Sequence, residues 1–175
     1  TYIYGPQKGV TVELRDELDH AMGAYAQVVK AYNGTDYAKT PGAGAAGGLG
    51  FAFLSYTNAV LESGVKIILE ETKLESFIKN AAFVITGEGR LVGQTVMGKA
   101  PIGVAEIAKK YEKKVLAFGG CVAEDATLCN QHGIDAFFPI LRTVTTLQEA
   151  MDFNHAKENL SAAVEQVFRL IQSFE

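Results

Sequence analysis

Residues 82–86 read Ala-Phe-Val-Ile-Thr, a short apolar run rich in strand-forming residues that predicts a buried strand. A second such run, residues 115–118 (VLAF), follows a predicted helix at residues 101–111 that carries Pro101 in its first turn. Residues 136–140 predict a third strand, after a helical stretch at residues 123–132. Strands that alternate with helices at this spacing indicate a parallel sheet wrapped by helices, so we expect an α/β fold.

Two helical features follow the third strand. Thr146 and Glu149 have the spacing of a capping box, which predicts the start of a short helix. A longer helix is expected at residues 156–173, because apolar residues recur there at helical spacing. The residues expected to be buried on this last helix are Leu160, Val164, Val167 and Leu170.

The first third of the chain has a different character. Residues 11–30 predict a helix with Thr11 as its N-cap, followed by a glycine-rich stretch at residues 41–50 (PGAGAAGGLG). That stretch runs into the apolar residues 51–54, so we expect a loop that turns into a buried helix. The buried face of the first helix is expected to comprise Leu14, Leu18, Ala21, Met22, Tyr25 and Val29.

Composition excludes several classes of protein. The 175 residues are 48% hydrophobic with a formal net charge of −4, and acids and bases are interspersed, so nucleic acid is not an expected partner. No apolar run reaches the ~18 residues of a membrane span, and residues 1–4 lack the features of a signal peptide, so we expect a cytoplasmic protein that does not bind membranes. Cys121, Cys129 and the three histidines match no metal or redox pattern, and the metal ligands stay unassigned.

The glycine-rich stretch contains Gly42, Gly44 and Gly47 at the spacing of the dinucleotide fingerprint. That fingerprint has its meaning directly after a strand, and the preceding residues 36–41 (DYAKTP) do not predict one. An NAD site is therefore not expected. Two interpretations remain open, a turn that lets a helix pack closely and a loop that binds an anion.

Residues 93–100 (GQTVMGKA) have the two glycines and lysine of a P-loop, but Ala100 replaces the serine or threonine that would hold magnesium. This is therefore not a Walker A site. Lys99 nevertheless lies just before a predicted helix, where a cation and free backbone N–H groups favour a phosphate. The alternative is a solvated lysine at a helix start.

Residues 86–90 (TGEGR) are expected as a loop at the carboxyl end of the first strand, the edge where open α/β sheets bind ligands. Arg90 could bind a carboxylate or phosphate with two parallel hydrogen bonds, and Glu88 could hold a magnesium-bound water. Alternatively, Glu88 and Arg90 could pair with each other. Residues 119–121 (GGC) are expected as a turn at the same edge, where they either line the cleft or only reverse the chain.

Three long motifs in one order carry a resemblance to a known family. They are residues 5–9 (GPQKG), residues 41–50, and residues 85–91 (ITGEGRL) followed by 93–95 (GQT) and 98–101 (GKAP). Together they resemble the bacterial glycerate kinase family, and the likeness covers essentially the whole chain. The resemblance implies a Rossmann-like parallel sheet with helices on both faces, plus part of a second, inserted α/β domain. It places residues 1–76 in the inserted domain and residues 77–175 in the Rossmann-like domain.

The resemblance also implies transfer of a phosphoryl group from ATP to a hydroxyl of glycerate, with Mg²⁺ as cofactor and glycerate as the small-molecule partner. Family members are longer at the N-terminus, so we expect a truncated chain that is inactive alone and that exposes an apolar edge or self-associates to a homo-oligomer. The alternatives are a non-catalytic nucleotide- or anion-binding α/β domain and a structural fragment without a ligand. The expected site residues are Lys99, Arg90 and Glu88 for catalysis, Gln94, Thr95, Gly87 and Gly89 for substrate, and Gly42, Gly44, Gly47 and Gly48 for nucleotide.

Overall fold

The computed structural model describes residues 1–174, apart from the side chain of Gln7. The chain divides into two compact units, Thr1–Glu62 and a second unit that begins at Ser63. Each unit is described by itself. The domain boundary after residue 76 that the family resemblance implies stays a prediction.

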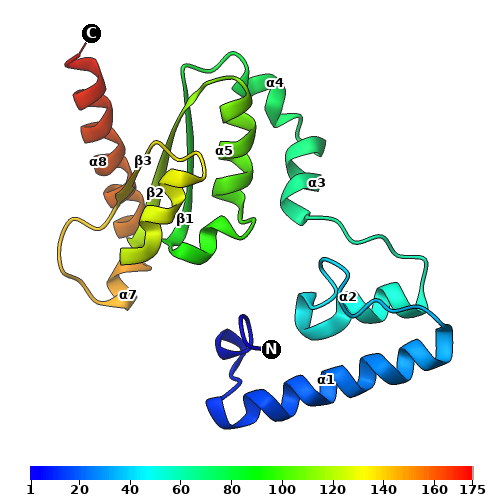
Figure 1. The fold of residues 1–175 in the computed structure, drawn as a ribbon. Coiled ribbons are helices and arrows are strands. Elements are labelled where there is room, and N and C mark those ends of the chain that lie inside the picture. Colours follow the sequence, from blue (N-terminus) through cyan, green and yellow to red (C-terminus); the bar gives the residue numbers. More distant parts are fainter. Residues whose placement is uncertain (175) are drawn as a thin grey trace. The chain divides into compact units, whose positions relative to one another are not determined.

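The second unit is built on a parallel three-stranded sheet (Figure 1). Its strands are β1 (Phe83–Leu91), β2 (Lys114–Val122) and β3 (Ala136–Pro139), in the spatial order β1-β2-β3. All three strands predicted from apolar runs are present, and both strand pairs are parallel. The predicted α/β class is therefore confirmed.

Helices cover both faces of this sheet. The connection from β1 to β2 runs through α5 (Ala100–Lys110), and the chain ends in α8 (Phe153–Gln172) on the opposite side of the sheet (Figure 1). Neighbouring residues of β2 face opposite sides of a strand, so they divide between two apolar clusters. The α5 side contains Val84, Ile102, Ala105, Val115 and Ala117, and the α8 side contains Leu116, Phe118 and Val167.

The remaining elements of this unit are short. The capping box predicted for Thr146 and Glu149 is confirmed at the start of α7, with both reciprocal hydrogen bonds formed. The helical stretch predicted at residues 123–132 is divided into η3 and α6. The short elements of the second unit are α3 (Gly64–Glu71), α4 (Leu74–Ile78), η2 (Gly93–Val96), η3 (Glu124–Thr127), α6 (Leu128–Gln131) and α7 (Leu147–Ala150).

β1 and β2 both extend further than predicted. Residues 86–90 were expected as a loop, but they form the second half of β1, and the expected turn at residues 119–121 lies inside β2. Both predictions are wrong because the glycines serve strand pairing. A Cβ on Gly87 would lie 2.4 Å from the carbonyl oxygen of Phe118 on the neighbouring strand, so only glycine fits there.

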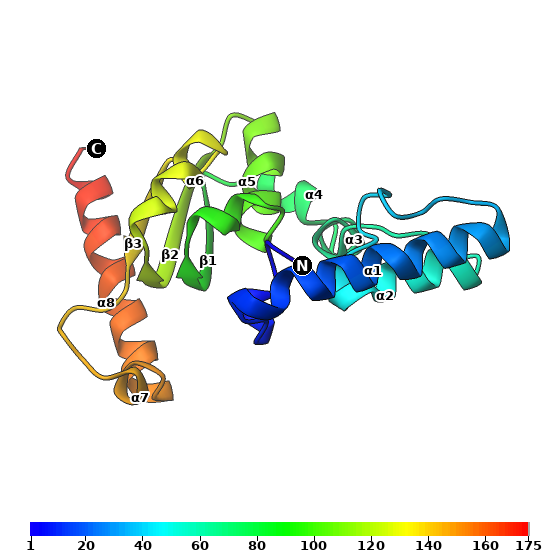
Figure 2. The same cartoon turned by 60° about the horizontal axis from the view of Figure 1, so that its bottom comes forward.

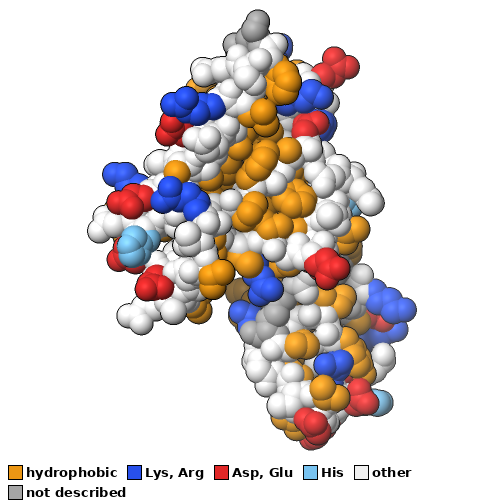
Figure 3. All heavy atoms as spheres, turned by 90° about the vertical axis from the view of Figure 1, so that its left-hand side faces the viewer, with side chains coloured by type: hydrophobic (Ala, Val, Ile, Leu, Met, Phe, Trp, Pro, Cys, Tyr) orange, Lys and Arg blue, Asp and Glu red, His pale blue; other side chains and the backbone are white. Residues whose placement is uncertain are grey.

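α8 buries less of its apolar face than predicted. Val167 is 8% exposed, as expected, but Leu160 is 43% exposed and Leu170 is 56% exposed. Figure 3, which views the molecule from the side where α8 lies in Figure 1, shows a band of hydrophobic side chains on this surface. The prediction of four buried residues on α8 is therefore wrong for Leu160 and Leu170.

The first unit consists of helices in its described part. It contains η1 (Pro6–Lys8), α1 (Val12–Asn33) and α2 (Ala45–Tyr56), which can be followed in Figure 2. Thr11 is the N-cap of α1, as predicted, although its side chain makes no capping hydrogen bond. Of the predicted apolar face of α1, Val29 is buried in a small core with Ala43 and Phe51. The other predicted members of that face, Leu14, Leu18, Ala21, Met22 and Tyr25, are exposed.

The glycine-rich stretch forms a kink inside α2. Ala46, Gly47 and Gly48 have left-handed backbone angles, with φ values of 51°, 69° and 99°. A Cβ on Gly48 would also lie 2.9 Å from Cε of Met22, so the backbone conformation favours glycine there and a side chain would displace the end of Met22. The helix that follows buries Phe51 but leaves Phe53 52% exposed, so the predicted buried helix is only half buried.

Every helix among residues 1–174 is too short or too polar to cross a lipid bilayer.

Candidate functional site

The carboxyl half of β1 and the link from it to α5 carry the charged residues that the sequence singles out. Glu88 lies on β1, Thr95 lies in η2, and Lys99 is the N-cap residue of α5. Because η2 is a single tight turn between β1 and α5, these three side chains meet at one edge of the sheet. The structure therefore brings together three of the predicted site residues.

Hydrogen bonds and an ion pair join the three residues through the carboxylate of Glu88. The hydroxyl of Thr95 donates to Oε1 of Glu88, and Nζ of Lys99 lies 3.3 Å from Oε2. The side chain of Glu88 is 19% exposed and that of Lys99 is 42% exposed, whereas Thr95 is fully buried. The carboxylate of Glu88 thus lies between the buried hydroxyl of Thr95 and the ammonium group of Lys99, whose side chain is partly exposed to solvent.

Backbone hydrogen bonds fix the turn that carries this cluster. The N–H of Thr95 donates to the carbonyl of Val92 at 2.9 Å, and the N–H of Lys99 donates to the carbonyl of Thr95 at 3.3 Å. Gly93 lets the turn pack tightly, because a Cβ there would lie 2.6 Å from a carboxylate oxygen of Asp125. The sequence from Gly93 to Lys99 therefore folds into a fixed link between β1 and α5.

Cys129 lies buried beneath the cluster. Its burial, together with the negative charges of Glu88 and Asp125, raises the pKa of the thiol above its ordinary value. A thiol with a raised pKa stays protonated near neutral pH and is a poor nucleophile. Cysteine chemistry is therefore not what this site supports.

The start of α5 offers fewer free N–H groups than the sequence suggests. The N–H groups of Ile102 and Gly103 donate to the carbonyl of Lys99 at 3.1 and 3.2 Å, and Pro101 has no N–H to donate. The positive end of the helix dipole remains at this point. An anion at this position would consequently be bound mainly by the ammonium group of Lys99.

Arg90 lies on β1, two residues after Glu88, and is exposed. The carboxylate of Glu88 bonds Thr95 and Lys99, so the alternative of a Glu88–Arg90 pair is not observed.

The other expected substrate contacts differ in what surrounds them. Gln94 is half-buried in η2, and Gly87 is in close contact with β2. Gly89 is different, because a Cβ at this position would meet no atom within 4 Å. Packing within the unit thus explains the glycine at 87 but leaves open space at 89.

The expected nucleotide-binding glycines all lie in the first unit. Gly42, Gly47 and Gly48 have positive φ values of 87°, 69° and 99°. Gly44 has a φ of −74°, and a Cβ there would meet no atom within 4 Å. Gly44 is therefore the member of this set whose identity is not required by the local fold.

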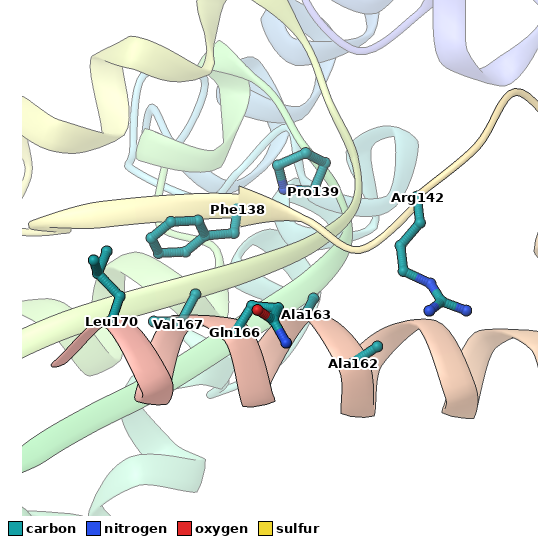
Figure 4. Close-up of a pocket in the computed structure, with 8 residues that line it drawn as sticks. All are labelled: Phe138, Pro139, Arg142, Ala162, Ala163, Gln166, Val167 and Leu170. Carbon is teal, nitrogen blue, oxygen red and sulfur yellow. The ribbon is translucent and has the colours of Figure 1, made fainter. Parts of the chain in front are cut away.

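Two hollows of the second unit lie apart from the charged cluster. One, of about 850 Å³, lies between α3, α4 and α5 and includes Gly98 but not Lys99. The other, of about 590 Å³, lies between β3 and α8 (Figure 4). Its walls are largely apolar, and Arg142 at its rim donates a hydrogen bond to Asn159 at 3.0 Å. Neither hollow contains Glu88, Thr95 or Lys99.

Metal binding by protein ligands alone finds no support in the described residues. Among residues 1–174, no group of three or more His, Cys, Asp and Glu side chains lies close enough together to hold a metal ion. A cation at this site would need oxygens from a substrate in addition to Glu88.

A parallel sheet with helices on both faces places the chain in the α/β class, and the charged cluster lies at the edge where such sheets commonly bind ligands. Comparison with known families assigns the chain to one family within this class. The model of the glycerate kinase family matches residues 1–172, and the chain belongs to that family.

Individual relatives agree with this membership. The chain is 44% identical to the glycerate 2-kinase of Escherichia coli K12 over 92% of its own length and 42% of the relative's. It is also 44% identical to the glycerate kinase of Bacillus subtilis 168, over 90% of its own length and 41% of the relative's. The chain thus spans about two fifths of the length of these relatives.

A solved structure shows the same fold. The crystal structure of a glycerate kinase 2 candidate from Salmonella typhimurium LT2 aligns with 99% of this chain, with a TM-score of 0.63 and 35% sequence identity. The alignment covers 43% of that longer chain.

Proposed function

We propose that this chain forms part of an ATP-dependent glycerate kinase, which transfers the terminal phosphoryl group of ATP to a hydroxyl of glycerate. The observation that carries the proposal is the match of the family model to residues 1–172. The charged cluster at the carboxyl edge of the sheet supports it, because ligands of open α/β sheets bind at that edge.

Lys99 is the residue with which the proposed chemistry begins. Phosphoryl transfer requires positioning and neutralisation of negative charge on the phosphoryl oxygens. The side chain of Lys99 is 42% exposed, lies at the start of α5 and has a single carboxylate partner, so its ammonium group can turn toward an incoming phosphate. Its role in the proposal is to neutralise charge on the transferred group or on the glycerate carboxylate.

Glu88 and Arg90 have separate roles in the proposal. Glu88 keeps Lys99 in place and offers one carboxylate to a magnesium-bound water, since Mg²⁺ is commonly held by one or two carboxylates together with substrate phosphates. Mg²⁺ bound with ATP would supply charge neutralisation between the phosphates. Arg90 lies exposed on β1, where its planar guanidinium suits a carboxylate or phosphate.

The remaining expected contacts stay part of the proposal. Gln94, Gly87 and Gly89 are proposed to line the glycerate site, where the open space at Gly89 allows the backbone to approach a ligand. Gly42, Gly44, Gly47 and Gly48 are proposed to bind the nucleotide. Self-association is proposed through exposed apolar surface such as that of α8.

The experiment is a coupled assay of the natural-length protein with ATP, Mg²⁺ and glycerate. Release of ADP that depends on glycerate, with a kcat in the usual range of ~1–10³ per second, is the expected result. Phosphorus NMR of the product then shows which hydroxyl carries the phosphate. Nucleotide binding without turnover would refute the proposed activity and favour a non-catalytic binding protein.

A further inference from the structure

Thr95 differs from the other residues of the charged cluster in its burial. It is 0% exposed, and it is the polar residue found in the buried core of the described chain. A substrate that approaches from solvent cannot reach its hydroxyl in this arrangement. Its place beside Glu88 and Lys99 therefore needs an explanation other than contact with a ligand.

Every polar group of Thr95 has a partner at the site. Its N–H donates to Val92, its carbonyl accepts from the N–H of Lys99, and its hydroxyl accepts from the N–H of Val92 at 3.1 Å. The same hydroxyl donates its proton to Oε1 of Glu88. One buried residue thus connects the carboxyl half of β1, the turn η2 and the N-cap residue of α5.

We propose that Thr95 is a positioning residue of the phosphoryl-transfer site, which fixes the carboxylate of Glu88 so that its second oxygen holds the ammonium group of Lys99. The inference rests on the proposed function, since it assigns Thr95 a part in that reaction. It replaces direct contact of Thr95 with substrate by an action through Glu88.

The relative strength of the contacts supports this assignment. In the ion pair between Lys99 and Glu88, which lie 3.3 Å apart, the side chain of Lys99 is 42% exposed. Ion pairs that are this exposed fix a side chain only weakly. The hydrogen bond from Thr95 comes from a fully buried residue and ends on a charged group, which makes it the stronger restraint on Glu88. Without it, Glu88 would be free to rotate, and Lys99 would lose its fixed partner.

This arrangement also lets Lys99 exchange partners. When a phosphate arrives, the ammonium group can leave Oε2 at little cost, because the contact is exposed to solvent. Glu88 stays in position meanwhile, because Thr95 continues to hold Oε1. The carboxylate is then available at a fixed place beside the transferred group.

The test compares four variants of the natural-length protein in the coupled assay with ATP, Mg²⁺ and glycerate. Thr95→Val keeps the shape but removes the hydroxyl, and we expect kcat to fall about tenfold or more with KM for both substrates within about twofold. Thr95→Ser keeps the hydroxyl and should restore kcat to within about threefold. Thr95→Val added to Glu88→Gln should lower kcat little further than Glu88→Gln alone, because both changes act on the same carboxylate.

Several outcomes would overturn the inference. A folded Thr95→Val variant with wild-type kcat removes the positioning role, as does a full multiplicative loss in the double variant. Lower melting temperature with unchanged kinetics would mean that Thr95 serves folding only. If Thr95→Val does not fold, Thr95→Ala is measured instead, with the same loss of kcat expected and wild-type kcat counting against the role.

A structural measurement separates this inference from the proposed function. If the unchanged protein shows no turnover, the proposed function fails, and crystal structures of the unchanged protein and Thr95→Val decide the role of Thr95. We expect the carboxylate of Glu88 to move away from Lys99 in the variant. A carboxylate that stays in place in the variant would refute the inference whatever the activity.

Discussion

Lys99→Ala separates the structural contribution of this lysine from its proposed contribution to catalysis. In the folded protein the ammonium group has one ion pair, at 3.3 Å from Glu88, and the side chain is 42% exposed. Exposed pairs of this kind contribute about 0–1 kcal/mol to stability. The carboxylate left behind keeps its hydrogen bond from Thr95 and can be reached by water. We therefore expect the free energy of unfolding to fall by less than about 1 kcal/mol.

The expected loss of activity is larger. A hydrogen bond to a charged group contributes about 1.5–3 kcal/mol when its partner is desolvated, as it would be in a closed phosphate site. At about 1.4 kcal/mol for each factor of ten, kcat/KM should fall between about 10-fold and 150-fold. Stability and activity should thus respond very differently to the same change.

The assay measures kcat/KM for glycerate in the natural-length protein, together with the melting temperature. Lys110→Ala is the matched control, because Lys110 lies on the same helix, is 61% exposed and has a similar single partner at 3.6 Å, Glu75. The control should retain wild-type kinetics. A folded Lys99→Ala variant whose kcat/KM is within about twofold of wild type would refute the role of Lys99. Equal losses of kcat/KM in Lys99→Ala and Lys110→Ala would also refute it, because loss of any positive charge on α5 would then have the same effect.

Other predictions address acid stability, the second cation, the glycine-rich kink and the isolated chain. Burial opposes ionisation of Asp135, but hydrogen bonds from Lys109 and a backbone N–H hold its pKa below the ordinary value, so its stabilisation is present above about pH 4 and is lost as the pH falls through the lower folded value. Asp135→Asn should cost about 1 kcal/mol in denaturant unfolding near neutral pH and progressively less below about pH 4, and a constant difference down to about pH 2 would contradict this. Arg90→Lys should lower kcat/KM at least tenfold with an unchanged melting temperature, because lysine lacks the planar fork, and unchanged kinetics would remove Arg90 from the site. Gly44→Val should leave the melting temperature within about two degrees but weaken ATP binding, whereas Gly48→Val should lower the melting temperature because of its φ of 99° and its contact with the neighbouring helix. The 175-residue chain alone should show no turnover, because it spans about two fifths of its relatives and β1 and β3 are the outer strands of a three-stranded sheet, and measurable turnover by it would contradict this expectation.

Most of the second unit could be predicted from local patterns. The apolar runs of β1, β2 and β3 and the proline at the start of α5 depend on neighbouring residues alone, and the structure confirms all four elements. The ends of β1 and β2 could not be predicted in the same way. Gly87 is a turn residue by its own preference, but the carbonyl of Phe118 on the neighbouring strand decides its place in the sheet.

The sequence also could not predict which apolar helix faces are exposed. Helical spacing shows which residues share a face, as it does for Leu14 and Leu18 on α1, but not whether another element covers that face. In the structure Leu14 is 46% exposed and Leu18 is 40% exposed. The pattern thus predicts the helix correctly, but the predicted burial of Leu14 and Leu18 is wrong.

The candidate site was predictable in its residues but not in its contacts. Glu88 could be selected because it lies toward the carboxyl end of a strand, and Lys99 because it precedes a helix, whereas Thr95 is expected from the family resemblance. Their connection depends on the tight turn η2, which brings the residues seven and eleven positions after Glu88 to its carboxylate. No pattern in the sequence predicts that Thr95 supports Glu88, and its burial is what distinguishes that support from contact with substrate.

The main core of the second unit has a consequence for the order in which this unit folds. Its buried members, from Ile78 to Ile134, come from one uninterrupted stretch of chain, with a single crossover helix between two paired strands. Contacts close in sequence form quickly because little loop entropy opposes them. During synthesis this stretch can therefore condense before α8 leaves the ribosome. α8 would then dock last, and because it is fixed mainly through Val167 and its neighbours, it would be the first element to detach in local unfolding.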